Sequence, residues 1–285
     1  MKRRAALLAA LAFLAAPPAA APDDAWIPLS DPSVTETSGL AAAPGGWLLW
    51  TIEDSGNALA LHAFSPSGDA LGAWPIAGAD DAASDWEDLA VAPAPDGQGR
   101  RLVIADIGDN DEDRPFVTLY VVPEPDPSTA GATLWAERLD FVYPDQPHDA
   151  EAILVHPFTG ETLVATKKPW GRAAVFRLPP EAAGPLERVA AVNGPGIGPW
   201  GAITGGAVAA DGSRAALLTY GGIAEWDVAP GQTLAEAIAA PPRMLPRPDI
   251  GQTEAIAYSA DGTVLYVTAE GRPSRLASIP LDPDR

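Results

Sequence analysis

The sequence predicts an all-β protein built as a single β-propeller, and three observations lead to that prediction. Thirty-one prolines and 27 glycines are spread along the 285 residues instead of being gathered in linkers. Short apolar runs bounded by turn residues dominate, and long helical periodicity is missing outside the first residues. A pattern of two strands joined by a tight turn also recurs at a spacing of about 50 residues.

The repeat unit has a small or acidic residue, a short apolar strand, a turn ending in glycine, and a second strand ending in Thr or Asp. The turn glycine supplies the positive φ that a tight hairpin needs. The pattern occurs in residues 37–51, 86–106, 150–166, 203–219 and 253–268. Aligning the turns gives one equivalent position, at spacings of 49, 64, 53 and 50 residues, occupied by Leu40, Leu89, Ile153, Gly206 and Ile256.

A period of this length in an all-β chain is typical of a propeller in which each repeat forms one four-stranded blade. The expected third strands are 60–66, 117–123, 173–179, 222–228 and 274–280. The expected outer strands are 70–78, 133–144, 185–194 and 242–247. The last repeat lacks an outer strand, and residues 25–31 match what is missing, so we expect the N-terminal strand to close the ring. The count is five blades, or six if the long second repeat contains another.

The first 21 residues have the pattern of a signal peptide. Lys2, Arg3 and Arg4 precede an apolar run over 5–16, which is too short to cross a bilayer. We therefore expect the propeller, residues 22–285, to be exported to a periplasm or to the cell exterior. No other segment is apolar enough for membrane insertion, and we expect a monomer.

Composition excludes several functions. The chain has no cysteine, which rules out disulfides, thiolate metal sites and a cysteine nucleophile. The net charge of −20 repels phosphate backbones and anionic lipids, so nucleic acid is not an expected partner. The acidic surface either keeps the protein soluble in salt or binds divalent cations.

Propeller geometry brings distant polar residues together. In each blade the first strand lies at the central channel and runs away from one face, and the second strand runs back. The starts of the first strands carry Ser38, Glu87, Glu151, Thr204 and Glu254, with Asp88 and Asp149 beside them. The ends of the second strands carry Asp54, Asp106, Asp109, Asn110, Lys167, Lys168, Tyr220 and Glu270. We expect all of these at one mouth of the channel.

The three glutamates at equivalent positions allow two interpretations. Each could cap backbone amides or lie in solvent. Facing a narrow channel together they would repel one another, so one must take a proton or a cation must lie between them. Oxygen ligands in a chain without cysteine favour Ca²⁺ or Mg²⁺ over zinc.

The acidic stretch 105–115, ADIGDNDEDRP, also has two interpretations. It could be an ordinary turn, in which Gly108 takes an unusual backbone angle and Asn110 bonds its own backbone. We favour a functional role for Asp106 and Asp109, with Asp106 among the catalytic candidates.

The few cations and histidines near this mouth complete the candidate site. Lys167 or Lys168 could neutralise Glu151 or another carboxylate of the ring, and the other lysine could hold an anionic group of a ligand. His148 could act as a general base at neutral pH or be ordinary surface. The candidate ligand-contacting residues are Asp54, Lys167, Lys168, Tyr220 and Glu270.

Several motifs together resemble a group of exported bacterial β-propeller proteins, mostly uncharacterised and labelled WD40-like or TolB-like. They are DWEDLAV (85–91), LVIADIGDN (102–110), PHDAEAILVHP (147–157) and TEAIAYSADG (253–262). The blade starts are also distantly similar to phytase-like (esterase-like) and calcium-dependent lactonase propellers. That resemblance implies a calcium site, with ligands carried over to Glu87, Glu151, Glu254, Asp109 and Asn110.

Two functions follow as hypotheses. The first is a propeller that binds a small-molecule ligand or a protein partner through its carboxylate-rich mouth, around a Ca²⁺ or Mg²⁺ ion. The second is a metal-dependent hydrolase of an ester, lactone or phosphoester. A purely structural role for the carboxylates is the remaining alternative, and the sequence leaves open whether the protein is an enzyme.

Overall fold

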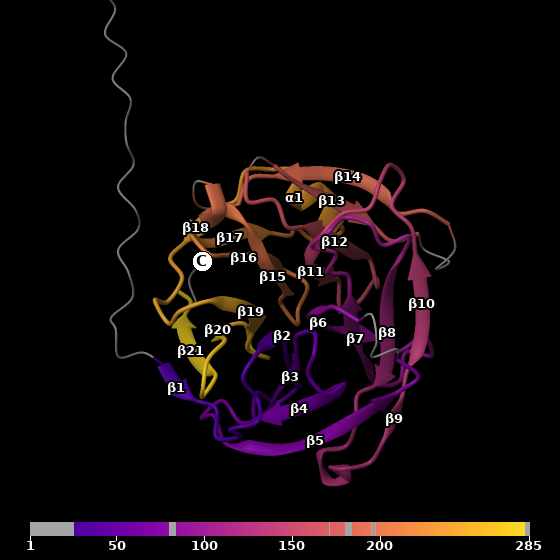
Figure 1. The fold of residues 1–285 in the computed structure, drawn as a ribbon. Helices are drawn as coiled ribbons and strands as arrows, with labels where there is room; N and C mark the ends of the chain where they lie inside the picture. Colours follow the sequence, from indigo (N-terminus) through magenta and orange to yellow (C-terminus); the bar gives the residue numbers. More distant parts are fainter. Residues whose placement is uncertain are drawn as a thin grey trace, which may run out of the picture.

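The computed structural model describes residues 26–79, 84–170, 172–179, 184–194, 196 and 198–282. Within these residues, five sheets stand around a central axis, as Figure 1 shows. The predicted single five-bladed propeller is therefore confirmed, and the long second repeat holds no sixth blade. The predicted signal peptide, residues 1–21, lies outside the described residues.

Each blade is an antiparallel meander that begins at the axis and ends at the rim. Blade one contains β2 (Thr37–Ala42), β3 (Leu49–Glu53), β4 (Ala60–Phe64) and β5 (Ala70–Ala77). Blade two contains β6 (Trp86–Pro93), β7 (Arg100–Asp106), β8 (Val117–Pro123) and β10 (Glu137–Phe141). Blade three contains β11 (Ala150–Val155), β12 (Thr162–Thr166), β13 (Ala173–Arg177) and β14 (Glu187–Val192). Blade four contains β15 (Ile203–Val208), β16 (Arg214–Thr219), β17 (Gly222–Asp227) and β18 (Arg243–Leu245).

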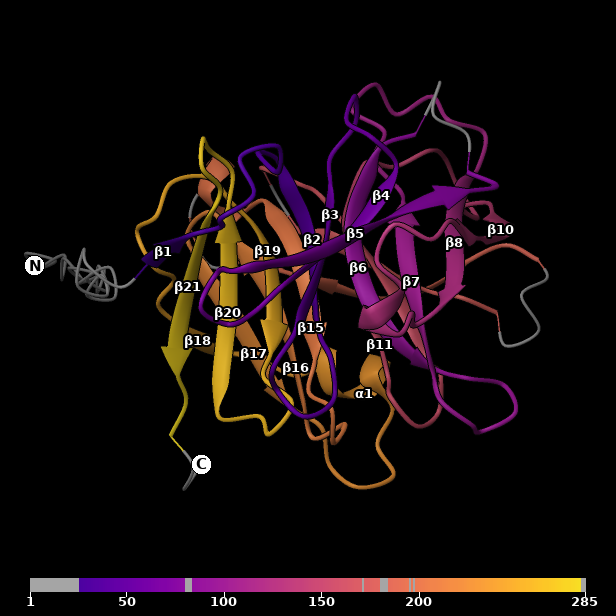
Figure 2. The same ribbon diagram turned by 90° about the horizontal axis from the view of Figure 1, so that it is seen from below.

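Blade five is completed by the N-terminal strand. It contains β19 (Thr253–Tyr258), β20 (Val264–Ala269) and β21 (Arg275–Pro280), and β1 (Trp26–Pro28) pairs antiparallel with β21. Figure 2 shows β1 lying along the outside of this blade. The expected closure of the ring by the N-terminal strand is confirmed.

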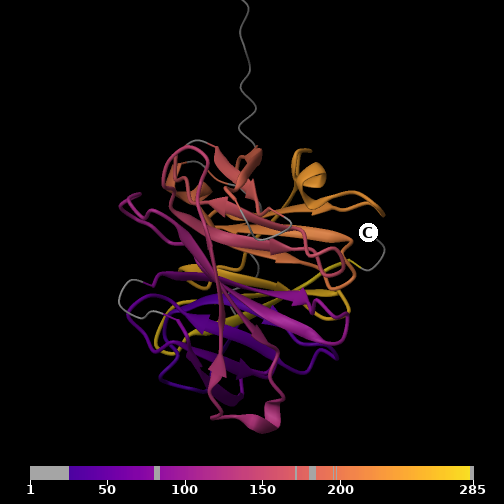
Figure 3. The ribbon, with the colours of Figure 1, turned by 90° about the vertical axis from the view of Figure 1, so that its right-hand side faces the viewer.

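The segment predicted as the outer strand of blade two, 133–144, is divided between two blades. Only β10 belongs to blade two, whereas β9 (Leu134–Trp135) pairs parallel with β5 of blade one. Leu134 packs against the core of blades one and two, and the Trp74 indole donates to Thr129 Oγ1 at 3.1 Å. Burial against blade one therefore holds this segment, which Figures 1 and 3 show along the outside of the ring.

The helical elements are short. The structure has η1 (Pro127–Thr129), η2 (Gly198–Gly201) and α1 (Leu234–Ile238), the last with a capping box between Thr233 and Glu236. Among the described residues, no helix has both the length and the apolar character needed to cross a membrane.

The hydrophobic core is divided into five clusters, each between two neighbouring blades. The largest side chains lie between blades one and two, where Trp50 and Trp74 pack edge to face at 5.2 Å between ring centroids. Alternate residues of the first two strands of a blade face opposite neighbouring blades, so β2, β3 and β11 are buried over nearly their whole length. Each fully buried large side chain contributes about 1.5–3 kcal/mol, which makes blade-to-blade packing the main source of stability.

Two glycines let the inner strands approach closely. A Cβ on Gly39 would lie 2.5 Å from the Leu89 nitrogen, and a Cβ on Gly206 would lie 2.8 Å from the Ile153 oxygen. At these positions backbone packs on backbone between blades, which narrows the middle of the channel and separates its two ends.

Candidate functional site at the carboxylate mouth

The same β-bulge recurs at the start of all five inner strands. In each case one extra residue on the inner strand interrupts its pairing with the second strand. The extra residues are Ser38, Glu87, Glu151, Thr204 and Glu254, the five positions that the sequence alignment placed as equivalent. A bulge re-aims a side chain and frees it from the regular alternation of the strand. We call this end of the channel the carboxylate mouth.

The two hydroxyl-bearing bulge residues tie neighbouring blades together. Ser38 Oγ donates to the backbone oxygen of Glu87 at 3.0 Å, and Thr204 Oγ1 donates to that of Thr253 at 2.9 Å. Each hydroxyl therefore bonds the backbone at the bulge of the next blade. The other three bulge residues are glutamates, and each is more than nine-tenths buried.

Lys167 provides the cation that the ring of glutamates requires. Its ammonium forms an ion pair with Glu151, and the charges of Glu87 and Glu254 also act on it. Burial lowers the pKa of Lys167, but these carboxylates, Glu151 first, raise it above its ordinary value, so the amine stays protonated. Burial raises the pKa of Glu151 against the opposing effect of Lys167.

Lys168 lies away from this ring and pairs with Glu112 on the loop after β7. The two adjacent lysines therefore neutralise carboxylates on different blades.

Tyr220 and Glu270 follow the second strands of blades four and five. The Tyr220 hydroxyl donates to Glu254 Oε1 at 2.7 Å, while burial and the Glu254 charge raise the pKa of Tyr220. Burial raises the pKa of the half-buried Glu270 to about 7, with further contributions from Glu254 and Asp54. Glu270 thus titrates near neutral pH.

Three carboxylates converge between blades one and two. Asp54, Asp85 and Glu87 each place one oxygen so that all three atoms lie within 4.8 Å of one another. Burial and then the charges of Glu151, Asp54 and Asp85 raise the pKa of Glu87 well above its usual value. The group must therefore take up a proton or bind a cation to relieve its repulsion.

Gly108 explains how the carboxylates approach so closely. Its φ lies outside the left-handed region, so the predicted turn in which Gly108 takes an unusual backbone angle is not what forms. Instead, a Cβ at this position would lie 2.3 Å from Asp85 Oδ2 and 2.4 Å from Glu87 Oε1. The glycine leaves the space in which two acidic side chains meet, and Asp85 is the residue that the sequence-based site omitted. Its signal in the sequence was its place two residues before Glu87 in the acidic stretch DWED (85–88).

The remaining acidic residues of 105–115 hold the loop. Asp109 accepts hydrogen bonds from the amides of Asp113 at 3.0 Å and Arg114 at 2.9 Å, and its own amide donates to Asp149 at 2.9 Å. Asp106 forms an ion pair of 2.9 Å with Arg114. Both Asp109 oxygens are thus occupied by backbone amides of its own loop, and the adjacent Asn110 is exposed to solvent.

His148 is buried among aromatic rings. It packs on Tyr143 and Phe176 at centroid distances of 4.9 and 5.2 Å, and its Nε2 lies 3.0 Å from Asp145 Oδ1. This environment places the imidazole in the packing of blade three.

Asp88 forms the floor beneath the mouth. Its carboxylate is fully buried and accepts the amides of Leu89 at 2.8 Å, Ile153 at 2.8 Å and Gly206 at 3.0 Å. Burial raises its pKa well above the usual value, against the opposing effect of these three amides. One side chain therefore joins the inner strands of blades two, three and four.

No protein-family model matches the sequence, and no curated protein matches it. A gluconolactonase from Xanthomonas campestris is similar in structure, with 16% identity, a TM-score of 0.48, and coverage of 90% of this chain and 80% of that one. A luciferin-regenerating enzyme is similar with 13% identity and a TM-score of 0.49, and the match covers 87% of this chain and 73% of that one. The WD40 repeats of RRP9 are similar with 13% identity and a TM-score of 0.47, and the match covers 90% of this chain and 98% of that one. Each of these likenesses is distant and concerns overall structure.

Proposed function

We propose that this protein is an exported propeller that binds a ligand at the carboxylate mouth around a divalent cation. The observation that carries the proposal is the convergence of Asp54, Asp85 and Glu87 over Gly108. Calcium–oxygen distances are about 2.3–2.6 Å, so two ligands on one ion lie at most about 5 Å apart, and these three oxygens meet that condition.

The position of the cluster also suits a site open to ligands. Asp54 and Asp85 are partly exposed, whereas Glu87 is buried. A cation held there would have protein oxygens on one side and solvent or a ligand on the other. Because hard cations prefer carboxylate oxygen, Ca²⁺ or Mg²⁺ is the expected ion. The ligand is a small molecule or a segment of a partner protein that offers further oxygen atoms.

The test is thermal unfolding of the mature protein after EDTA treatment, with Ca²⁺ or Mg²⁺ then titrated. An ion that binds the folded state raises the midpoint saturably. Glu87→Gln should remove this rise. Because burial, and then the neighbouring carboxylates, disfavour the ionised form of Glu87, the same change should raise the midpoint of the ion-free protein at pH 8. The control is Glu137→Gln, an exposed glutamate on β10. No shift with either ion in the unmodified protein contradicts the proposal.

Hydrolysis of an ester, lactone or phosphoester is the second candidate, and Glu270 is the observation that favours it. A carboxylate with a pKa of about 7, close enough to Asp54 for their charges to interact, is suited to accept a proton at neutral pH. A bound divalent cation would supply Lewis acidity at such a site. Calcium-dependent hydrolysis of a simple lactone that Glu270→Gln reduces without changing the Ca²⁺ affinity would support the enzyme, whereas ion binding without turnover would support the binding protein.

A further inference from the structure

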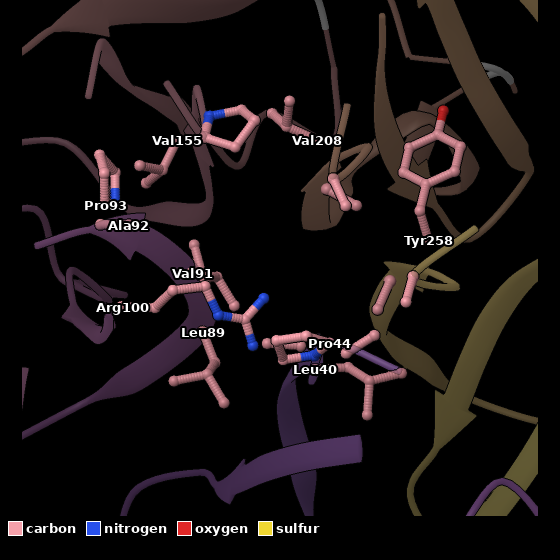
Figure 4. Close-up of a pocket in the computed structure, with 18 of the residues that line it drawn as sticks. Leu40, Pro44, Leu89, Val91, Ala92, Pro93, Arg100, Val155, Val208 and Tyr258 are labelled. Atoms are coloured by element: carbon pink, nitrogen blue, oxygen red, sulfur yellow. The ribbon is translucent and has the colours of Figure 1, made fainter. Parts of the chain in front are cut away.

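A second concave site lies at the opposite end of the channel. Its volume is about 320 Å³, and residues from the inner strands and hairpins of all five blades line it, as Figure 4 shows. These residues follow the inner strands to their ends, whereas the carboxylates stand at the strand starts. We call this site the apolar mouth. Its volume is at the lower end of the range for small-molecule sites, about 300–1,000 Å³.

The lining is almost entirely apolar. Leu40, Leu89, Val91, Val155 and Val208 form much of it, together with alanines and prolines. Tyr258 contributes its ring, because its hydroxyl donates to Glu225 Oε1 at 2.8 Å.

Among the described residues that line the site, Arg100 is the one that carries a charge. Its guanidinium extends into the space bounded by Leu89, Val91 and Pro44 in Figure 4. An apolar wall with a single polar group is the usual composition of a small-molecule site.

The Arg100 guanidinium is positioned by a carboxylate that lies outside the cavity lining, that of Glu124. Nε and Nη2 donate to the Glu124 carboxylate at 3.0 and 2.8 Å, and the Trp50 indole donates to the same carboxylate at 2.9 Å. Glu124 is not part of the lining. The remaining nitrogen, Nη1, has no hydrogen-bond partner among the described residues, so the positioned group keeps free donors at the cavity.

From this arrangement we infer that the apolar mouth binds a small anionic amphiphile, a molecule with a hydrocarbon body and one carboxylate or similar acidic group. The hydrocarbon lies against the alanine, valine and leucine wall, and the anion accepts from Arg100 Nη1. A volume of about 320 Å³ lies at the lower end of the range for small-molecule sites, so we choose a hydrocarbon body of about eight carbons for the test. Charge-assisted hydrogen bonds from a fixed guanidinium favour an acidic head group over a neutral one.

The acidic surface of the protein does not prevent this. Repulsion between the net charge of −20 and an anion is screened beyond about 8 Å at physiological ionic strength. The carboxylate mouth lies on the far side of Asp88 and the close-packed inner strands, so the two sites are independent. Failure of one proposal leaves the other intact.

The experiment uses 8-anilinonaphthalene-1-sulfonate, an apolar anion that fluoresces in apolar sites, with octanoate and octan-1-ol as competitors at 0.15 M salt. We expect the dye to bind with one-to-one stoichiometry, and octanoate to displace it about tenfold more effectively than octan-1-ol. Equal displacement by the two competitors, or none by octanoate, overturns the inference.

Two variants locate the site. Ala90→Phe adds a ring at a partly buried lining position and should abolish dye binding. Arg100→Gln should weaken octanoate about tenfold and leave octan-1-ol unchanged. The matched control is Arg138→Gln, an exposed arginine paired with Asp140 on the outer strand β10. Thermal unfolding confirms that each variant is folded. Dye binding that survives Ala90→Phe places the dye elsewhere and overturns the inference.

Discussion

The two ends of one channel differ in almost every chemical property. At the carboxylate mouth, acidic side chains are buried with raised pKa values and one paired lysine among them. At the apolar mouth, the same strands present alanine, valine, leucine and proline around one arginine. The difference arises within about six residues of each inner strand.

The contrast follows from how each strand begins and ends. The bulge at the start of each inner strand turns an extra residue out of the ladder, and a polar residue stands there in all five blades. Beyond the bulge the pairing is regular, the side chains alternate between neighbouring blades, and small residues face the axis. Local backbone irregularity thus decides where polar chemistry is placed in a ring that otherwise repeats.

The largest expected effect is at Asp88, which separates the two ends. Asp88→Ala removes the acceptor of the Leu89, Ile153 and Gly206 amides and leaves three buried N–H groups without this partner. We expect the free energy of unfolding to fall by about 3–5 kcal/mol in urea titrations followed by tryptophan fluorescence. Asp88→Asn retains an oxygen and should lose less. A fall below about 1 kcal/mol for Asp88→Ala would show that the three amides do not depend on this carboxylate.

The second prediction tests whether Gly108 affects binding at the carboxylate mouth without affecting binding at the apolar mouth. In Gly108→Ala the new methyl group meets the mobile ends of Asp85 and Glu87, which can move aside at little cost in stability. We expect Ca²⁺ affinity, measured by calorimetry, to fall about tenfold or more because the carboxylates are displaced. Gly201→Ala, whose added Cβ has no contact shorter than 3.5 Å, is the control. Octanoate binding at the apolar mouth should be unchanged, and an equal loss at both ends would contradict their independence.

The third prediction concerns pH. A carboxyl group whose pKa is raised on folding stabilises the protein below its unfolded pKa, and that stabilisation is lost as the pH rises through the folded value. For Glu270 the loss falls between about pH 4.5 and the folded value of about 7. Without divalent ions, the unfolding midpoint should therefore be about 3 °C higher at pH 6 than at pH 8.

Glu270→Gln should reduce this slope, and saturating Ca²⁺ should raise the midpoint more at pH 8 than at pH 6. Octanoate binding at the apolar mouth should change little over the same interval. An unfolding midpoint that rises with pH in EDTA would be inconsistent with the raised pKa values.

The smallest effect is expected at the rim of the apolar mouth. Phe158 lines this site with 70% of its surface exposed. Phe158→Ser should change the free energy of unfolding by less than about 0.5 kcal/mol. Dye affinity should nevertheless fall about threefold, in proportion to the lost apolar contact. A loss of unfolding free energy well above about 0.5 kcal/mol with unchanged dye affinity would show that Phe158 packs in the core instead of contacting the ligand.

The sequence predicted the fold well because the fold repeats. Turn glycines and apolar runs recur in register, so aligning them located the inner strands, the ring closure and the equivalence of Glu87, Glu151 and Glu254. It failed at 133–144, where docking on blade one depends on Trp74 and Leu134, which lie 60 residues apart.

The sequence predicted that the polar residues of the candidate site gather at one end of the channel. It did not predict which of them form ion pairs or hydrogen bonds with one another. The sequence contained no measure of which carboxylate Lys167 would reach, or that Asp109 would bond its own loop. Asp85 could not be predicted as part of the site, because the space that its side chain enters is created by Gly108. That glycine follows β7, whereas Asp85 precedes β6, and only the pairing of the two strands brings them together. The apolar mouth could not be predicted for a related reason. In the sequence its lining residues have the pattern of ordinary core residues, and only the folded ring shows that they surround a cavity.

The repeated bulge has a consequence for how such a protein can diversify. Five blades make the same backbone irregularity with serine, threonine or glutamate in it, so the residue there can change without altering any strand pairing. Duplication of a blade would copy the bulge together with the strand and give each copy a position free to vary. A ring assembled in this way can acquire new chemistry one blade at a time while the scaffold that holds it stays the same.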